Sequence, residues 1–232
     1  AAAGGALYND WGTLVAGFST TVDSLLAIRD AVYRDGAISL EELAEALRAN
    51  FEGFEPLRMR LRNRCAKYGR DDESADALAV RLYHFLRAEL GRYRTCLGGT
   101  FHLGIFSGWG WDEHGRHRGS HVSHGSLSGA TPDGRFAGQP LSENIGPAPG
   151  SDMAGLTAVA NSVTRLDHRY GLGGISVNCR LSPATLARPT DRRKLIAFLR
   201  QFMRQGVFEV QMNVVDSKVL REAKADREKH RT

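Results

Sequence analysis

The chain has 232 residues, of which 42% are hydrophobic and 25% charged, a balance typical of a soluble domain with a core and not of a disordered chain. No stretch approaches the roughly 20 consecutive apolar residues that cross a bilayer, and residues 1–12 lack the basic and apolar segments of a signal peptide. We therefore expect a cytoplasmic protein with no membrane partner.

The net charge of +5 raises the question of a nucleic-acid partner, because clustered lysines and arginines neutralise phosphates. The basic residues are spread along the chain among acidic ones, so we expect no such partner. The three cysteines, Cys65, Cys96 and Cys179, are far apart and lack CxxC spacing. Their spacing suggests neither a disulfide framework nor a zinc knuckle and indicates reduced thiols.

The first helix is predicted over residues 20–36. Its apolar side chains recur on one helical face, at Val22, Leu25, Leu26, Ile28 and Val32. Thr20 or Thr21 is expected as the N-cap, and Gly36 lies just past the end.

The second helix is predicted over residues 39–53. Ser39 and Glu42 have the spacing of a capping box, in which each side chain bonds the free backbone amide of the other residue, and Gly53 is expected to end the helix. Further helices are predicted over residues 56–64 and 73–92, with Asp71 and Asp72 near the positive end of the longer one. Residues 1–94 are therefore expected to be helical.

After Arg94 the pattern changes to short apolar runs between glycines. The sequence TFHLGIF, residues 100–106, predicts a strand. Residues 107–150 are rich in glycine, proline and polar turns, and so long a segment is expected to carry function or to line a site. Residues 95–150 are thus expected to form a strand and a long loop.

Residues 151–232 predict the order helix, strand, helix, strand, helix. The segments are residues 155–166, 174–182, 190–206, 207–215 and 216–229, the last starting at Asp216 or Ser217. A strand–helix–strand succession implies a right-handed crossover between parallel strands, and their apolar character predicts burial on both faces. The residues alone therefore predict an α/β fold.

Histidines and acids gather in the long loop. They are His102, His114, His117, His121 and His124, together with Asp112 and Glu113. Imidazole and carboxylate are ordinary ligands of zinc or iron, which makes a metal-binding loop one hypothesis. The spacing lacks the HExxH helix geometry, and solvated histidines explain the cluster at least as well. We therefore assign no metal ligand.

Residues 130–138, ATPDGRFAG, have the composition of a tight turn. Pro132 presets its backbone angle, Asp133 can bond forward to the backbone, and Gly134 accepts a positive φ. Composition alone favours a plain turn. The functional alternative is that the turn aims Arg135 at a carboxylate or phosphate, so Asp133, Gly134 and Arg135 are the candidate cavity residues.

Two other patterns do not indicate a catalytic or binding site. Asp71 and Asp72 are adjacent and point in different directions on a forming helix, so helix capping is favoured over a cooperating acid–base pair. Residues 4–9, GGALYN, are not a phosphate loop, and no GxSxG nucleophile signature occurs.

Taken in order, eight segments resemble the later part of the glycyl-radical enzyme family, of the pyruvate formate-lyase and glycerol dehydratase type. They are GGALYN, DSLLAIRDAVY, SLEELAEALRANFEG, KYGRDDE, GATPDGRFAGQPLSENIGP, GLTAVANSVTRLDH, GGISVNCRLSP and VQMNVVDSKVLREAK. The resemblance covers residues 4–231, and ATPDGR followed by NVVDSKVLREAK is its most specific pairing. One position departs from the pattern, since Arg70 stands where the family usually has Asn.

The resemblance implies a helix-rich part of a ten-stranded α/β barrel, with βαβ units in the C-terminal third. In that family the barrel shelters a radical on a glycine in a motif like RVxGY, and a cysteine in a Gly-Cys loop passes the radical to substrate. Neither motif matches here, because the last glycine is Gly206 and the three cysteines lie in other contexts. No catalytic residue is therefore carried over.

The resemblance further implies one of several activities of anaerobic metabolism: formate acetyltransferase, diol or glycerol dehydratase, or a related C–C, C–O or C–N lyase. We expect the chain to be a fragment, residues 1–232 forming part of a pyruvate formate-lyase-like domain, that supplies barrel scaffold and cavity wall and is inactive alone. The start without methionine and the unfinished polar helix at the end agree with this. No cofactor is expected to bind directly, and a radical SAM activating enzyme would install the radical in the complete enzyme.

The expected partners are the remainder of the parent enzyme, the activating enzyme, a small-molecule substrate and a second copy in a homodimer. Two alternatives stay open. A non-catalytic split or decayed subunit would dock onto a partner that carries the missing loops, and it predicts a large exposed apolar face. A metal-binding protein built on the histidine loop is the other.

Overall fold

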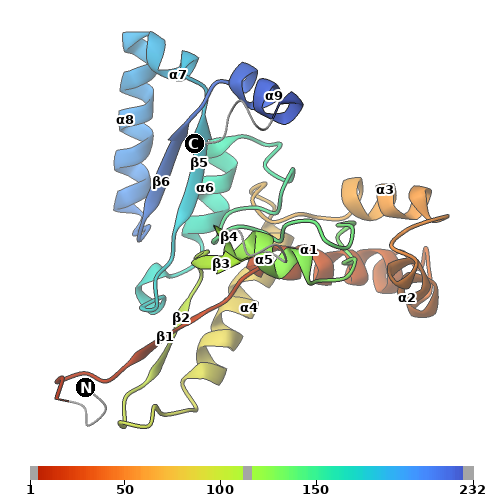
Figure 1. Cartoon of the computed structure of the whole chain (residues 1–232), viewed down its shortest axis with the longest axis horizontal. Coiled ribbons are helices and arrows are strands. Elements are labelled where there is room, and N and C mark those ends of the chain that lie inside the picture. The colour runs from red at the N-terminus through yellow and green to blue at the C-terminus, as the bar shows by residue number, and fades with distance from the viewer. Residues whose placement is uncertain (1–4, 112–116, 227–232) are drawn as a thin grey trace.

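The computed structural model describes residues 5–111 and 117–226, and the first of these ranges is mainly helical. Figure 1 shows the first three helices extending to one side of the molecule, away from the C-terminal strands and helices. The helical elements of this range are α1 (Phe18–Ile28), a π-helical continuation (Arg29–Arg34), α2 (Leu40–Arg48), α3 (Glu55–Asn63) and α4 (Glu73–Leu90).

The predicted caps are confirmed where they depend on neighbouring residues alone. At the start of α2, the Glu42 amide donates to Ser39 Oγ at 3.0 Å and the Ser39 amide donates to the Glu42 carboxylate at 2.6 Å, which completes the capping box. Asp72 caps α4 by accepting from the Ala75 amide. Both side chains satisfy amides that a helix leaves free in its first turn.

Two predicted helix ends are wrong, and tertiary contacts explain both. Thr20 is not an N-cap, because α1 begins after Gly17 (φ 79°) and the Thr20 hydroxyl accepts from the Ser142 amide instead. The second helix ends at Arg48, five residues before Gly53. Its chain turns back through left-handed residues so that the Phe51 side chain, 1% exposed, packs edge-on to Phe136.

The strands form short pairs. The predicted strand β2 (Phe101–Gly104) is present and pairs in parallel with β1 (Trp11–Leu14), which the sequence did not indicate. β3 (Trp109–Trp111) and β4 (His117–Gly119) form an antiparallel hairpin before α5 (Ser120–Ser126). β5 (Val177–Leu181) and β6 (Val210–Val214) pair in parallel. A parallel bridge between Ile105 and Ile175 links the β1–β2 pair to the chain that enters β5.

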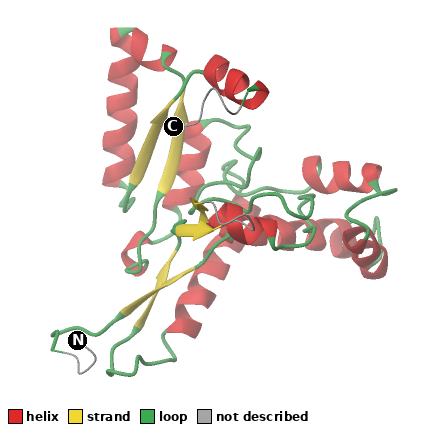
Figure 2. Ribbon diagram, viewed as in Figure 1, coloured by secondary structure: helices red, strands yellow, loops and turns green. Residues whose placement is uncertain are grey.

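The remaining helices surround the β5–β6 pair, as Figure 2 shows. They are α6 (Leu156–Thr164), a 3-10 turn (His168–Tyr170), α7 (Ala184–Ala187), α8 (Pro189–Arg204) and α9 (Ser217–Ala225). Asp216 caps α9 through the Lys218 amide, as predicted. The prediction that both strands are buried on both faces is wrong: β5 buries one face, with Val177 and Cys179, but Arg180 on its other face is exposed, and the residues of β6 are all exposed or half-buried.

Two clusters of apolar side chains form the core. The larger packs α1, α4, α6 and α8 against β2 and β5, with Tyr68 and Tyr83 among its largest buried members. The smaller joins the end of α1 to α2 and α3 around Phe51 and Leu61. Burial of these side chains is the main stabilising contribution to the fold. Among the described residues, no helix is long and apolar enough to span a membrane.

The contribution of the capping box to the stability of α2 can be tested by mutation. Ser39→Ala removes the acceptor for the Glu42 amide, so the first turn of α2 should lose about 1 kcal/mol of stability. Hydrogen exchange of the α2 amides should show this as faster opening. Glu45→Ala, an exposed change in the same helix without a side-chain partner, should leave the exchange rates near those of the unchanged protein, and equal effects of the two changes would contradict the capping role.

Candidate functional site

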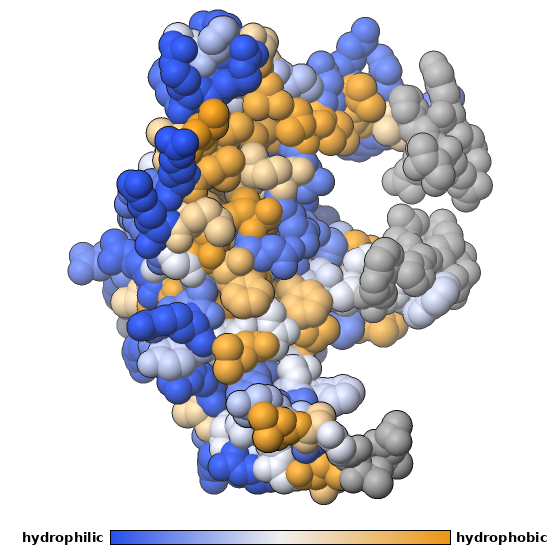
Figure 3. Space-filling view, turned by 90° about the vertical axis from the view of Figure 1, so that its left-hand side faces the viewer, coloured by the Kyte–Doolittle hydropathy of each residue, from blue (hydrophilic) through white to orange (hydrophobic). Residues whose placement is uncertain are grey.

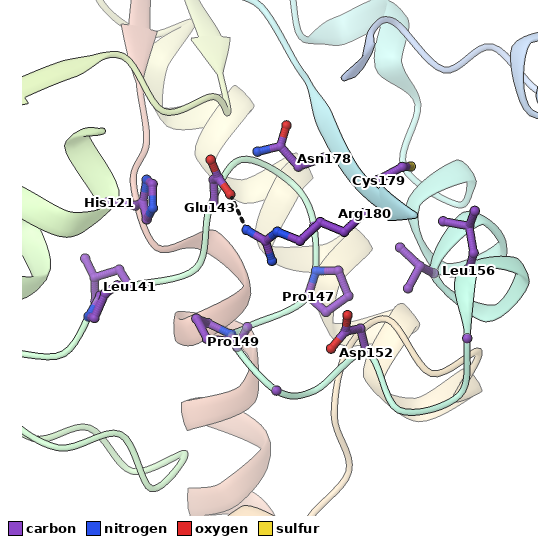
Figure 4. Close-up of a pocket in the computed structure, with 16 residues that line it drawn as sticks. His121, Leu141, Glu143, Pro147, Pro149, Asp152, Leu156, Asn178, Cys179 and Arg180 are labelled. Atoms are coloured by element: carbon purple, nitrogen blue, oxygen red, sulfur yellow. Dashed lines mark hydrogen bonds and ion pairs between the residues drawn. The ribbon is translucent and has the colours of Figure 1, made fainter. Parts of the chain in front are cut away.

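A cavity of about 440 Å³ lies where residues 140–156 pass the end of β5. Figure 4 shows its polar side chains, with Arg180 reaching from β5 toward Glu143 on the loop. Asn178 and Arg180 are two residues apart on β5, so they share one face of the strand. The loop supplies Glu143 and Asp152, and His121 comes from α5.

One ion pair lines this cavity, and the exposed carboxylate of Asp152 adds a further negative charge. The Arg180 guanidinium and the Glu143 carboxylate form an ion pair at 3.1 Å. Burial lowers the pKa of His121 below its ordinary value, with Arg180 acting in the same direction and Glu143 opposing it. His121 is therefore neutral near pH 7, and its Nδ1 is buried without a hydrogen-bond partner in the described part of the chain.

Asn178 and Cys179 complete the wall contributed by β5. The Oδ1 of Asn178 is buried and accepts no hydrogen bond from the described residues. An unpaired buried carbonyl is unfavourable by about 1–3 kcal/mol, which makes it a strong acceptor for a ligand that enters the cavity. Cys179 is 1% exposed and belongs to the larger core cluster. Burial raises the pKa of its thiol to about 11, so Cys179 is protonated and is no thiolate nucleophile.

The loop has neither helix nor strand between residues 141 and 151, and the first turn of α1 holds it in place. Ser19 Oγ donates to the Gly146 carbonyl at 2.5 Å. The Ser142 amide donates to Thr20 Oγ1 at 2.9 Å, and the Thr20 amide donates to Ser142 Oγ at 3.1 Å. These bonds pair backbone groups that would otherwise be buried without partners.

Further contacts fix the middle of the loop. The Ile145 amide donates to the Ser176 carbonyl at 3.2 Å, beside the start of β5. Asn144 and Ser107 exchange two side-chain to backbone hydrogen bonds. The Arg70 guanidinium donates to the Ser151 carbonyl at 2.8 Å. The cavity wall is therefore held by at least three separate segments.

Gly69 packs directly beneath the loop. Its φ is 89°, and a Cβ built on it would lie 2.3 Å from Pro147 Cγ. Only glycine satisfies both the left-handed backbone and the missing space.

The turn at residues 130–138 lies on the far side of this loop and lines a second cavity. Asp133 Oδ1 accepts from the Thr131 hydroxyl at 2.5 Å and from the Arg135 amide at 3.4 Å. The Arg135 guanidinium donates to Thr131 Oγ1 and to the Gln139 and Gly129 carbonyls. Gly134 packs against α3, where Arg58 donates to its carbonyl. Hydrogen bonds within the turn thus use each nitrogen of the Arg135 guanidinium, and ligand binding by Asp133, Gly134 and Arg135 stays a prediction.

The histidine segment is only partly described. His114, Asp112 and Glu113 lie outside the described residues, as does the side chain of His117. His102 contacts Asp10 at 3.2 Å, away from His121 in the cavity. Among the side chains that are placed, no three His, Cys, Asp or Glu residues come together as metal ligands.

Sequence reasoning missed most of the cavity residues. Glu143, Asn178 and Arg180 carry no local signal, because a single polar residue in a loop or strand has many ordinary roles. Only the unusual length of the segment 107–150 indicated that it would line a site.

Comparisons with known proteins agree on one family. The family profile described as "Pyruvate formate lyase-like" matches residues 1–108, and the profile "Glycine radical" matches residues 141–232. The chain is 37% identical, over 98% of its length, to "Probable dehydratase YbiW" of Escherichia coli (strain K12), and covers 28% of that protein. It is 31% identical, over 95% of its length, to "Trans-4-hydroxy-L-proline dehydratase" of Clostridioides difficile, of which it covers 26%.

Solved structures agree. The chain superposes with a TM-score of 0.86 on the glycerol-bound form of the B12-independent glycerol dehydratase from Clostridium butyricum, at 34% identity. The match covers 98% of this chain and 28% of that one. The chain therefore spans little more than a quarter of the length of these relatives.

The contact beneath the loop can be tested with a matched pair of glycines. Gly69→Ala should push Pro147 away and destabilise the protein by several kcal/mol, since a new Cβ there meets a packed ring. Gly53 also has a positive φ (77°) but nothing within 4 Å of a built Cβ, so Gly53→Ala should cost only the backbone strain of about 1 kcal/mol. Thermal unfolding midpoints measure the difference, and equal losses would show that Pro147 does not constrain residue 69.

Asp23 lies under the same loop, and its raised pKa predicts that the stability of the protein depends on pH. Burial raises its pKa to about 7, although Lys67 and the Tyr68 amide partly offset the shift. Because the unfolded carboxyl titrates near pH 4, the folded state binds an extra proton between about pH 4 and pH 7, and stability falls as pH rises through this range.

Asp23→Asn removes that titration. The free energy of unfolding of the unchanged protein should fall relative to that of the variant between about pH 4 and pH 7, by at most about 1.4 kcal/mol per pH unit, as measured by denaturant unfolding at each pH. Parallel profiles of the two proteins would contradict the raised pKa.

Proposed function

Because the chain belongs to the glycyl-radical enzyme family, we propose that it forms part of a glycyl-radical dehydratase or related lyase. It supplies strands of the barrel and one wall of the substrate cavity, at Glu143, Asn178 and Arg180. The observation that carries the proposal is the cavity itself. Apart from His121 and Pro140, its lining residues lie within the region matched by the glycine radical profile, and its walls are held by contacts from the rest of the chain.

The open strand pairs support a larger barrel. β1 and β6 each have an edge without a partner strand among the described residues. Exposed edges of this kind are normally covered or paired. The parallel bridge between Ile105 and Ile175 joins the β1–β2 pair to the β5–β6 pair side by side. The relatives are longer than this chain, so the rest of such a protein could supply further strands. A ten-stranded barrel, with this chain as part of it, accounts for both features.

An apolar surface supports the same arrangement. Figure 3 shows apolar side chains gathered in a band down the side of the molecule that carries α8, β6 and the β1–β2 pair. Apolar side chains that are 40% exposed or more, in these elements or next to them in the chain, include Trp11, Leu14, Ile196, Met203, Phe208 and Val214. Apolar surface of this extent marks an interaction site, and the remainder of a complete enzyme would cover it.

The charge of the cavity favours a neutral substrate. Among the described lining residues, Arg180 is the one arginine or lysine, and it is already paired with Glu143. The other basic side chain, His121, is neutral. A buried anion would need an unpaired cation. We therefore favour a small, uncharged, hydroxylated molecule such as a diol or triol over a sulfonate or a carboxylate, and over the formate acetyltransferase reaction.

In the complete enzyme the glycyl radical and its cysteine partner would supply the hydrogen-atom transfer. The residues of this chain bind and orient the substrate. Asn178 Oδ1 accepts from a substrate hydroxyl, and neutral His121 Nδ1 offers a second polar contact, while the apolar walls from Leu156 and Val159 exclude water. Exclusion of water and oxygen protects radical intermediates from side reactions.

The proposal includes partners that the complete enzyme needs. A radical SAM activating enzyme would generate the radical, the remaining barrel would carry the two catalytic loops, and the enzyme would work as a cytoplasmic homodimer. A split or decayed subunit that docks onto a separate chain is the alternative. The same exposed apolar band would serve such docking.

Anaerobic activation tests the function. The protein, at the full length encoded by its gene, should acquire a glycyl radical visible by electron paramagnetic resonance when treated with a radical SAM activase. It should then dehydrate a small diol or triol. Absence of the radical with each activase encoded in the same genome would favour the non-catalytic subunit instead.

Asn178→Ala tests the cavity. Loss of one hydrogen bond to a bound hydroxyl should lower kcat/KM by about 10-fold to 100-fold, while the radical content stays unchanged. Gln201→Ala, which removes an exposed amide on α8, is the matched control and should have normal kinetics. Normal kinetics in both variants would place the substrate elsewhere.

A further inference from the structure

A second cavity, of about 710 Å³, borders the same loop as the substrate cavity but has a different lining. It is enclosed by α3, by the chain before α4, by the turn at residues 130–138 and by residues 148–153. Five of its lining side chains are cationic, and they come from three of these segments: Arg58, Arg62, Lys67, Arg70 and Arg135. One lining carboxylate, Asp133, opposes them.

The protein offsets these cations only in part, because Asp23 attracts Lys67 and Asp133 attracts Arg58 and Arg135. None of the five lies within 4.0 Å of an acidic oxygen in residues 5–111 or 117–226. The Asp133 carboxylate accepts from the Thr131 hydroxyl and the Arg135 amide, and it acts on Arg58 and Arg135 only over a longer distance. Burial lowers the pKa of the Arg58 guanidinium, the nearby Arg62 lowers it further, and Asp133 partly opposes both effects.

Two of the cations have donors that no group in residues 5–111 or 117–226 satisfies. Lys67 is only 2% exposed, and its ammonium makes one long hydrogen bond, of 3.4 Å, to the Asp133 carbonyl. The ammonium has three donors, and a buried cation without a partner is strongly unfavourable. Arg62 makes no hydrogen bond or ion pair with the described residues, and its Nη2 lies beside Gly150 at the cavity wall.

Arg58 and Arg70 add further free donors. Each uses its Nε for a backbone carbonyl, of Gly134 and Ser151 respectively, and the Arg58 guanidinium also stacks over the Phe136 ring at 3.7 Å. The terminal nitrogens of both guanidinium groups have no partner among the described residues. These bonds fix the two side chains in place, so their remaining donors are preorganised around the cavity.

We propose that this cavity is a binding site for a small, doubly charged oxyanion of the phosphate class, held between Lys67 and Arg62. Ammonium and guanidinium donors match the oxygens of such an anion, and a charge of −2 offsets the surplus of cations that the protein leaves unpaired. The cavity has room for a phosphate with a small organic group attached. This site does not depend on the proposed dehydratase reaction, because the two cavities have no charged lining residue in common.

Inorganic phosphate is the probe. The protein at its full encoded length should show a saturable rise of its thermal midpoint with phosphate, beyond the effect of sodium chloride at matched ionic strength, and calorimetric titration should give the same Kd. Arg62→Gln should weaken phosphate binding at least tenfold. Arg62 is half-buried and unpaired, so the variant should fold normally.

Arg64→Gln is the matched control, since Arg64 is an exposed arginine at the end of the same helix and does not line this cavity. It should bind phosphate like the unchanged protein. Lys67→Met, studied if circular dichroism shows a normal fold, should abolish binding. A response no larger than that to chloride, equal affinity in Arg62→Gln, or an equal response to acetate would each overturn the assignment. Catalytic activity plays no part in the readout.

Discussion

The structure depends on one constraint, that a buried chain without regular secondary structure must still pair its backbone polar groups. Residues 141–151 meet this constraint with contacts from distant parts of the chain. Ser19 and Thr20, in the first turn of α1, bond Gly146 and Ser142, while the Ser176 carbonyl accepts from the Ile145 amide. A helix start and a strand start therefore fix a loop that lies more than 100 residues from α1 and beside both cavities.

The two faces of this loop differ sharply in charge. On one side, Glu143 and Arg180 form an ion pair and His121 is neutral, which leaves the Asp152 carboxylate as the remaining charge of the lining. On the other side, five cations face a single carboxylate. Pro149 and Gly150 line both cavities, so the two cavities share part of one wall.

Local interactions were predictable from the sequence, and long-range ones were not. The caps at Ser39, Asp72 and Asp216 follow from side chains within three residues. β1 could not be found, because WGTL becomes a strand only by pairing with β2, some 90 residues later. Thr20 failed as a cap for the same kind of reason, since its hydroxyl bonds Ser142. The ATPDGR turn was recognised, but its composition could not show that Arg135 would bond to the turn itself.

Two of the buried polar groups that lack partners among the described residues lie in the walls of the cavities. Asn178 Oδ1 and the ammonium of Lys67 are buried in different cavities, and each lacks the partners that its chemistry requires. In a finished core such groups are rare, because each one is unfavourable by at least about 1 kcal/mol. A neutral acceptor calls for a hydroxyl and a buried cation calls for an anion. The same reasoning that favours a hydroxylated substrate in the first cavity therefore predicts an oxyanion in the second.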